Sequence, residues 1–400
     1  MRRNIAILAL SPTSIAMIAF TSKWVLTPTE RLRDAVVLVE GQTVIEVTTQ
    51  ESIQIPENAR VTDFGDRAIA PGLVDIHIHG AAGHDVMHEG ESGRAKMEQF
   101  LARHGVTSYY PTTVTATVDQ IQSALERLAD SIESSSNGAG RAQALGIHLE
   151  GPFLSHVRRG MHAAENLVQP SLKAFERFWQ ASRGHIRVMT IAPELESAEE
   201  VITEATRRGV CVSMGHSDAD VEATRRGIRA GAHHATHTFN AMRPLDHREP
   251  GIIGEVLTDK QVTADIIADG IHVNPAIVAL LLRAKGPEGA VLITDATSAT
   301  GMPDGVYDLG PVKVEVKGGA CVKGQTLAGS ILTLDQAVRN AMKFASWDLQ
   351  DAVRAASLNP AKTTLSAKKG TIAAGADADF VVLTSSGEVA TTVIKGTVIQ

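Results

Sequence analysis

Two histidines separated by one residue, His77 and His79, end an alternating apolar segment that begins at Val74. Side chains of an extended strand alternate between its two faces, so both imidazoles are expected to lie on the same face. Two imidazoles that face a protein interior cost free energy unless each is bonded to a partner. A bound metal ion would satisfy both, which makes the pair a candidate for metal ligation.

Four further ionisable side chains each stand at the end of a predicted strand. They are Glu150, His216, His237 and Asp295. The carboxyl ends of parallel barrel strands meet at one rim, which is where barrel enzymes carry out their chemistry. Six such residues on five strands are better explained by one metal site than by separate buried polar groups.

The ligand types indicate the metal and the reaction. Imidazole and carboxylate ligands without cysteine suit Zn(II), Fe(II), Mn(II) or Co(II). Such a metal with an open position lowers the pKa of a bound water to about 7 and supplies hydroxide for hydrolysis. A neighbouring carboxylate can take the proton from that water and pass it to a leaving group. We predict that Asp295 performs this general base and acid role.

Alternating strands and helices must position these residues. Strands are predicted to begin near residues 74, 107, 144, 186, 211, 233, 263 and 291. Amphipathic helices are predicted at 94–104, 121–132, 172–182, 198–208 and 276–285. Eight alternating units favour a closed parallel (β/α)8 TIM barrel over an open doubly wound sheet. A Gly-rich, hairpin-like segment at 304–326 is predicted to form a flap ahead of a helix at 334–344.

Both ends of the chain are rich in short β-strands. The strands fall between about residue 18 and residue 70, and again from residue 371 onward. Neither end alone has enough apolar surface for a stable sheet, so we expect them to pack together as one small β-sandwich. The α/β chain is therefore divided into an N-terminal part of the sandwich (1–70), the barrel (71–358) and a C-terminal part of the sandwich (359–400).

The amino-acid composition limits which partners the protein could bind and which cellular compartment suits it. Hydrophobic residues make up 44% and charged residues 21% of the 400, as in a globular protein, and the formal net charge is −7. Nucleic acid is a poor partner for a chain of this sign. The two cysteines, Cys211 and Cys321, have no CxxC spacing, which excludes a disulfide framework and a cysteine zinc site and fits a reducing compartment.

The N-terminus has the charge and apolar order of a signal peptide. Two arginines after Met1 precede a short apolar run, but Pro12, Thr13 and Ser14 interrupt it. No stretch reaches the roughly 18 apolar residues that a membrane span needs. We therefore predict a cytoplasmic protein with no membrane partner.

The order of these motifs resembles a known group of enzymes. The segment Pro71-Gly-Leu-Val-Asp-Ile-His-Ile-His-Gly80, followed by His216, His237 and Asp295, resembles the amidohydrolase superfamily. Its enzymes combine this barrel with a β-sandwich made from both chain ends. Many members bridge two metals with a carboxylated lysine on the fourth strand. Residues 185–193 contain no lysine, so a hydantoinase-like site is disfavoured and Glu150 is the available bridge.

Further motifs resemble the N-acetylglucosamine-6-phosphate deacetylase family. They are His148-Leu-Glu-Gly-Pro-Phe153, Gly160-Met-His162, His237-Thr-Phe-Asn-Ala-Met242, Arg248-Glu-Pro-Gly251, Ala268-Asp-Gly-Ile-His272, Thr294-Asp-Ala-Thr297 and Leu327-Ala-Gly-Ser330. The similarity runs in order from about residue 22 to residue 400. It implies metal-dependent hydrolysis of N-acetyl-D-glucosamine 6-phosphate to D-glucosamine 6-phosphate and acetate, in amino-sugar catabolism or cell-wall recycling.

The resemblance also implies how the metals are held. One metal would be bound by Glu150, His216 and His237. Members of the family that keep the first-strand histidine pair can hold a second metal through His77, His79, the shared Glu150 and Asp295. We therefore expect one or two divalent ions per chain, with zinc the leading candidate and iron, manganese or cobalt as alternatives.

The resemblance assigns the substrate-binding residues as well. Arg248 carries a forked guanidinium, which is well suited to a phosphate dianion. The family pattern places the phosphate at Arg248, His272 and the backbone of Asn240 and Ala241. It places the sugar or the acetyl carbonyl at His162, beside Met161. The segment of Leu327, Ala328 and Gly329 would close over the acetamide group. The family can complete its pocket across a subunit interface, so we expect a homodimer or a larger assembly built from dimers.

Two other functions remain open from the sequence. The first is the same hydrolysis on a related amide, such as N-acetylgalactosamine 6-phosphate or an N-acyl amino acid. The second is a scaffold that keeps the barrel without catalysis, although such relatives usually lose ligands and every expected polar group is present here. Three strand histidines, His148, His233 and His234, are expected either to pack in the core or to orient ligands.

Overall fold

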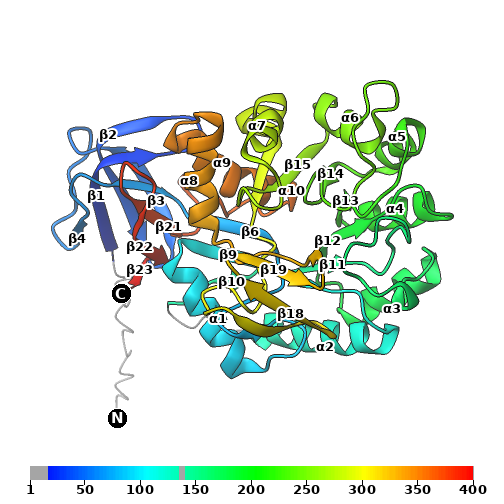
Figure 1. Cartoon of the computed structure of the whole chain (residues 1–400). Coiled ribbons are helices and arrows are strands. Elements are labelled where there is room, and N and C mark those ends of the chain that lie inside the picture. Colours follow the sequence, from blue (N-terminus) through cyan, green and yellow to red (C-terminus); the bar gives the residue numbers. More distant parts are fainter. Residues whose placement is uncertain (1–16, 135–139, 400) are drawn as a thin grey trace, which may run out of the picture.

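The computed structural model describes residues 17–134 and 140–399. Figure 1 shows a barrel on one side and a smaller β-domain, built from both ends of the chain, on the other. The stretch with the order of a signal peptide falls within residues 1–16, outside the described residues.

Eight parallel strands form the barrel, as the alternating pattern predicts. They are β6 (Leu73–Ile78), β9 (Val106–Thr113), β11 (Ile147–Glu150), β12 (Ile186–Ile191), β13 (Cys211–Met214), β14 (His234–Ala235), β15 (Thr263–Ile267) and β16 (Ala290–Ile293). The ring closes between β6 and the segment after β16, where the Asp295 amide donates to the His77 carbonyl over 2.9 Å. Buried Val, Ile and Leu side chains fill the strands.

One predicted strand differs in its start. The third barrel strand begins at Ile147, because Gln143–Ala144 forms a separate short strand, β10, that pairs with β9. Gly146 lies between the two pieces, and a Cβ there would come within 2.4 Å of the Arg187 side chain. The chain therefore passes close to the neighbouring strand before it enters the barrel.

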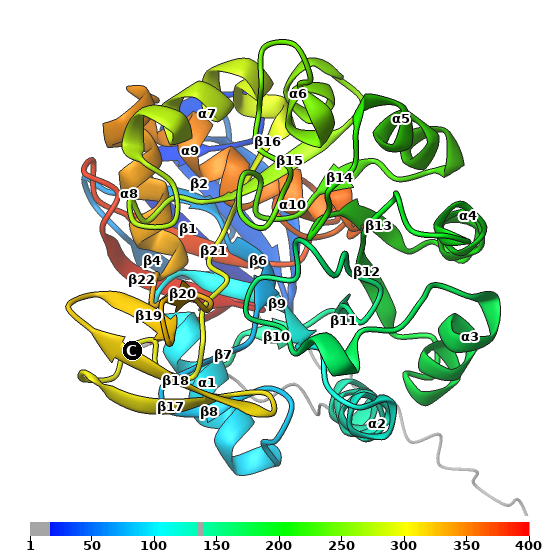
Figure 2. The same cartoon turned by 45° about the vertical axis from the view of Figure 1, so that its right-hand side comes forward.

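Helices surround the barrel (Figure 2). They are α1 (Glu91–Arg103), α2 (Val118–Ser134), α3 (Leu172–Ala181), α4 (Ala198–Arg207), α5 (Val221–Ala230), α6 (Gly251–Thr258), α7 (Pro275–Gly289), α8 (Leu334–Ala345), α9 (Leu349–Ala356) and α10 (Leu358–Thr363), with a 3₁₀ turn, η1 (Ala164–Asn166). Local sequence sets their starts. Asp220, for example, caps α5 by accepting a hydrogen bond from the Ala223 amide over 2.8 Å. Each helix turns an apolar face toward the strands, which buries the core.

The predicted flap segment forms a four-stranded antiparallel sheet. Its strands are β17 (Gly305–Leu309), β18 (Val312–Lys317), β19 (Ala320–Lys323) and β20 (Thr326–Leu327). A short hairpin, β7 (Gly80–Ala81) and β8 (His84–Asp85), holds its base, because the Asp85 carboxylate accepts from the Gly310 amide over 2.8 Å. On its other side Lys323 donates to the Met161 carbonyl over 3.1 Å. The flap is therefore tied to loops that follow the first and third barrel strands.

The β-domain from both chain ends is confirmed. Its strands are β1 (Met17–Leu26), β2 (Arg31–Glu40), β3 (Thr43–Thr49), β4 (Arg60–Asp63), β5 (Ala68–Pro71), β21 (Phe380–Leu383), β22 (Val389–Ile394) and β23 (Thr397–Ile399). They belong to one hydrogen-bonded sheet in which β5 pairs with β21. Phe20 packs against Phe64 and Phe380, so the core joins the two ends of the chain. The predicted boundaries at residues 70 and 358 remain a proposal.

Two further features of the described chain bear on the sequence predictions. None of its helices combines the length and the apolar character that crossing a lipid bilayer requires. Cys211 and Cys321 are both buried and unpaired. Burial raises the pKa of the Cys211 thiol, so this group behaves as a small apolar side chain.

Candidate metal centre

All six predicted ligands converge at the carboxyl rim of the barrel. They are His77, His79, Glu150, His216, His237 and Asp295, and each is buried. His77 belongs to β6 and Glu150 ends β11, while the other four follow strand ends by one or two residues. The strand order thus brings together residues that are far apart in the sequence.

Glu150 forms the first group with two histidines. Its Oε1 lies 3.3 Å from His216 Nε2 and 3.1 Å from His237 Nε2. The two Nε2 atoms are 3.1 Å apart. Three potential ligand atoms therefore surround one small volume.

The same carboxylate also faces the second group. His79 Nε2 lies 3.3 Å from Glu150 Oε2 and 3.1 Å from Asp295 Oδ1. His77 Nε2 lies 3.4 Å from Glu150 Oε1, 3.5 Å from Asp295 Oδ1 and 3.3 Å from His79 Nε2. Glu150 therefore stands between two groups of nitrogen and oxygen atoms, each suited to one cation.

Hydrogen bonds at the far ring nitrogens support this reading. His216 Nδ1 lies 3.0 Å from the Arg158 carbonyl, and His79 Nδ1 lies 3.0 Å from the Thr112 carbonyl. A carbonyl can only accept, so the proton of each neutral ring is on Nδ1 and the lone pair of Nε2 points into the site. Lone pairs that face other nitrogens and carboxylate oxygens at 3.1–3.5 Å need a positive charge between them. The donor set fits a divalent metal ion.

The pKa shifts of the buried groups also favour a bound cation. Burial raises the pKa of Glu150, but the neighbouring imidazoles, His77 first, hold the pKa of that carboxyl well below its usual range. The pKa of Asp295 is also held low by His77 and His79 against the effect of burial. Burial lowers the pKa of both His79 and His237, yet Asp295 and Glu150 raise the pKa of His79 to about 10, and Glu150 raises that of His237 to about 9. The two carboxylates thus attract positive charge, and a bound cation competes with these protons.

The backbone is strained where the ligands are presented. His216, His237 and Asp295 have φ angles of +47°, +29° and +49°. Residues other than glycine rarely adopt positive φ angles, and each such residue costs on the order of 1–3 kcal/mol of conformational free energy. Strain at three of the six predicted ligands indicates that the surrounding fold holds these side chains in place for function rather than for stability.

Asp265 positions His237 and was not among the residues predicted from the sequence. One carboxylate oxygen of this buried residue accepts from the His237 amide, and the other lies 3.0 Å from His234 Nε2. His234 Nδ1 in turn lies 2.7 Å from the Thr263 hydroxyl. The available signal was a single carboxylate inside the otherwise apolar strand β15. His148, by contrast, bridges the Ile76 carbonyl and the Thr190 hydroxyl, so it orients strands within the barrel.

His162 lies nearer to the metal centre than its predicted substrate role requires. With Glu150 and His216 it forms one of two groups whose ligand atoms lie within 4.8 Å of one another, and the other group is His77, His79 and Asp295. Its Nε2 is 3.9 Å from Glu150 Oε2, whereas His237 Nε2 is 3.1 Å from Glu150 Oε1. Burial lowers the pKa of His162 to about 3, which keeps the ring neutral. We prefer His237 as the ligand because it is closer.

The predicted substrate residues lie in loops that follow the strands. Gly329 has a φ of +63°, and a Cβ there would come 2.9 Å from the Asp295 carbonyl and 2.5 Å from Thr297 Cγ2. Only glycine lets the segment of Leu327, Ala328 and Gly329 approach Asp295 so closely. A Cβ on Gly160 would come 3.3 Å from His216 Cε1 and 3.7 Å from Ala241 Cβ. The loop of Met161 and His162 therefore runs beside both the metal centre and Ala241.

The predicted phosphate residues are placed differently from one another. Asn240 is half-buried and donates to the His237 carbonyl over 3.2 Å. The His272 ring lies 2.6 Å from an Asp269 oxygen, which fixes its orientation. Arg248 is exposed in the loop between β14 and α6, and its guanidinium makes no ion pair within the described residues. Its charge is free to meet a ligand.

Comparison with known sequences points to one family. The amidohydrolase family model matches residues 68–399. A protein from Bos taurus named N-acetylglucosamine-6-phosphate deacetylase is 41% identical over 347 residues, which is 84% of each chain. Another of the same name from Bacillus subtilis (strain 168) is 35% identical over 376 residues, covering 94% of this chain and 95% of its own.

Solved structures agree with the sequence comparison. A mutant N-acetyl-D-glucosamine-6-phosphate deacetylase from Mycobacterium smegmatis, in complex with N-acetyl-D-glucosamine-6-phosphate, superposes with a TM-score of 0.89 at 35% identity. The match covers 96% of this chain and 100% of that one. The Thermotoga maritima N-acetylglucosamine-6-phosphate deacetylase gives a TM-score of 0.85 at 31% identity, covering 96% and 99%.

Proposed function

This chain belongs to the amidohydrolase family, and we propose that it hydrolyses N-acetyl-D-glucosamine 6-phosphate to D-glucosamine 6-phosphate and acetate. The observation that carries the proposal is the Glu150 carboxylate, which lies within 3.4 Å of the Nε2 atoms of four buried histidines. An arrangement of this kind suits a metal-dependent hydrolase. Relatives of this name that cover most of the chain supply the substrate class.

Glu150, His216 and His237 would hold one divalent ion, and His77, His79 and Asp295 would hold a second that shares Glu150. Zinc is the ion we propose, because it readily accepts imidazole and carboxylate ligands in an open site. A bound divalent ion would supply Lewis acidity toward the acetyl carbonyl and toward water.

Asp295 is proposed to move the proton. Its pKa is held below the usual range by His77 and His79, so the carboxylate is ionised and can accept a proton from the attacking water. It then delivers that proton to the amide nitrogen as the C–N bond breaks, which releases the amine and acetate. Its side chain is 11% exposed, more than that of any other predicted ligand, so a substrate can reach it.

The remaining predicted residues are proposed to bind the substrate. Arg248, His272 and the backbone of Asn240 and Ala241 would hold the phosphate, with His162 on the sugar or the acetyl group. Met161 and the segment of Leu327, Ala328 and Gly329 would enclose the acetamide beside Asp295. We also propose that the enzyme is a dimer or an assembly of dimers, in which the exposed Arg248 reaches a neighbouring subunit's pocket. A cytoplasmic location is proposed on the two unpaired cysteines.

The direct test combines metal analysis with acetate release. The purified protein is assayed on N-acetylglucosamine 6-phosphate, on its galactosamine epimer and on unphosphorylated N-acetylglucosamine. We expect bound divalent metal and the highest kcat/KM on the first substrate. A metal-loaded protein that releases no acetate from any of the three would overturn the proposal.

A further inference from the structure

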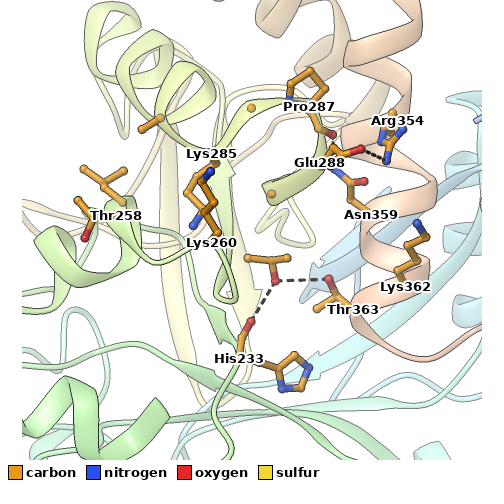
Figure 3. Close-up of a pocket in the computed structure, with 15 residues that line it drawn as sticks. His233, Thr258, Lys260, Lys285, Pro287, Glu288, Arg354, Asn359, Lys362 and Thr363 are labelled. Atoms are coloured by element: carbon orange, nitrogen blue, oxygen red, sulfur yellow. Dashed lines mark hydrogen bonds and ion pairs between the residues drawn. The ribbon is translucent and has the colours of Figure 1, made fainter. Parts of the chain in front are cut away.

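A polar cavity lies at the amino end of the barrel strands, away from the metal centre. Its volume is about 690 Å³, and it is enclosed by the ends of α6 and α7 and by α9 and α10 (Figure 3). Thr263 and Gly289 line it, at the start of β15 and just before β16. The predicted ligands His237 and Asp295 follow the other ends of strands β14 and β16. The cavity is therefore separated from the metal centre by the length of the barrel.

Positive charge dominates the lining of this cavity. Four basic side chains contribute, Lys260, Lys285, Arg354 and Lys362, against one carboxylate among the described residues that line it, Glu288. Glu288 is already engaged, because Arg354 donates to it over 3.0 Å. The chain as a whole carries a net charge of −7, so this local excess of cations stands out from its surroundings.

Two of the cations have no partner. Lys260 and Lys362 are exposed, and the side-chain ammonium of neither forms a hydrogen bond or an ion pair with any residue in the described part of the chain. They extend from different elements, Lys260 from the loop after α6 and Lys362 from α10. Figure 3 shows them on opposite sides of the cavity. Two unpaired ammonium groups across one cavity are suited to meet an anion between them.

The other two cations are held in place and still have donors to spare. Lys285 donates to the carbonyls of Val256 and Asp259 over 2.8 and 2.6 Å, and burial lowers its pKa. Arg354 donates to Glu288 and to the Pro28 carbonyl, while its buried Nε–H has no acceptor among the described residues. Both side chains are therefore fixed beside the cavity, and each keeps further N–H donors that a ligand can use.

We propose that this cavity binds a phosphate-bearing small molecule at a site separate from the metal centre. Charge-assisted bonds from Lys and Arg are the usual means of holding a phosphate group. The volume exceeds that of a phosphate ion and falls within the 300–1,000 Å³ of typical small-molecule sites. The polar side chains of His233, Thr263 and Thr363 also line the cavity and can bind the hydroxyls of such a molecule. The inference does not depend on the proposed hydrolysis.

The experiment titrates glucose 6-phosphate into the metal-loaded, full-length protein by calorimetry. The Arg248→Ala background is used throughout, so that phosphate binding at the metal centre is weakened. Lys260→Gln/Lys362→Gln removes the two unpaired charges at nearly constant size. Lys96→Gln/Lys173→Gln is the matched control, because both of these lysines are exposed and lie outside the cavity. Glucose without phosphate is the ligand control.

We expect glucose 6-phosphate to bind the background protein and the control variant equally, and the cavity variant at least ten-fold more weakly. Glucose should not bind. Equal affinity for the cavity and control variants, or no binding to either, would overturn the proposal. Thermal denaturation checks that both variants fold. Turnover of the cavity variant in the otherwise wild-type chain, without added ligand, should equal that of the wild type, so loss of catalysis and loss of this site remain distinguishable.

Discussion

The two ends of the barrel use polar residues in opposite ways. At the carboxyl end, histidines and carboxylates are buried, lie within 3.5 Å of one another and are presented by strained backbone. At the amino end, Lys260 and Lys362 are exposed and unpaired. Backbone strain and the burial of polar groups cost free energy, and they are kept where chemistry needs a fixed geometry. Exposed charges cost little free energy and remain accessible to a ligand. Substitutions should therefore have large effects at the first end and small effects at the second.

The largest effect is expected from Asp295→Asn. The amide cannot accept a proton from water, so kcat should fall by about 10²–10⁴-fold while the fold persists. The measurement is steady-state acetate release together with circular dichroism and metal content. Retention of more than about a tenth of wild-type turnover would remove Asp295 from the proton-transfer role.

The His77→Ala/His79→Ala variant should remove one of the two proposed metal sites and leave the other intact. One metal per chain is expected to remain, held by Glu150, His216 and His237, with reduced activity. Metal content after dialysis checks this. During mild chelation, the wild type should first lose the ion held by His77 and His79. Two tightly bound metals in the double variant would mean that the second site uses other residues.

Asp265→Asn tests whether the carboxyl end depends on groups behind the ligands. The substitution replaces a carboxylate oxygen beside the His237 amide or His234 by an NH₂ group. Metal affinity should fall by about 10–100-fold, as is usual for partners that orient a ligand. Asp119→Asn, at an exposed side chain on α2, is the control and should leave affinity unchanged. If both variants bind metal alike, Asp265 serves stability alone.

Arg248→Ala should act on binding rather than on chemistry. A lost charge-assisted contact is worth about 1.5–3 kcal/mol, so KM for the 6-phosphate sugar should rise about ten-fold or more. Unphosphorylated N-acetylglucosamine serves as the internal control, because its KM should hardly change. Equal effects on both substrates would refute the phosphate assignment.

The smallest effect is expected at the amino end. Lys260→Gln/Lys362→Gln removes two exposed charges without breaking a bond, so the free energy of unfolding should change by less than about 0.5 kcal/mol. Urea denaturation measures this. A loss several times larger would show that these lysines stabilise the fold, and the contrast between the two ends would then not hold.

Much of the molecule follows from local sequence patterns. The period-two pattern before His79 and the polar residues that end five strands identify the barrel and the six candidate ligands, because periodicity determines which face a side chain occupies. The motifs beyond them, such as the one at Arg248, identify the family. The strand starts agree except near residue 144, where the close approach of Gly146 to Arg187 interrupts the strand.

The tertiary structure alone decided which distant groups meet. The support of His237 by Asp265 and the position of His162 near Glu150 both depend on strand order and register. The cavity between Lys260 and Lys362 depends on how helices far apart in the chain pack together. Local patterns carry no information about these contacts, because hydrogen bonds and electrostatic interactions depend on distances of a few ångströms that only the packed fold sets.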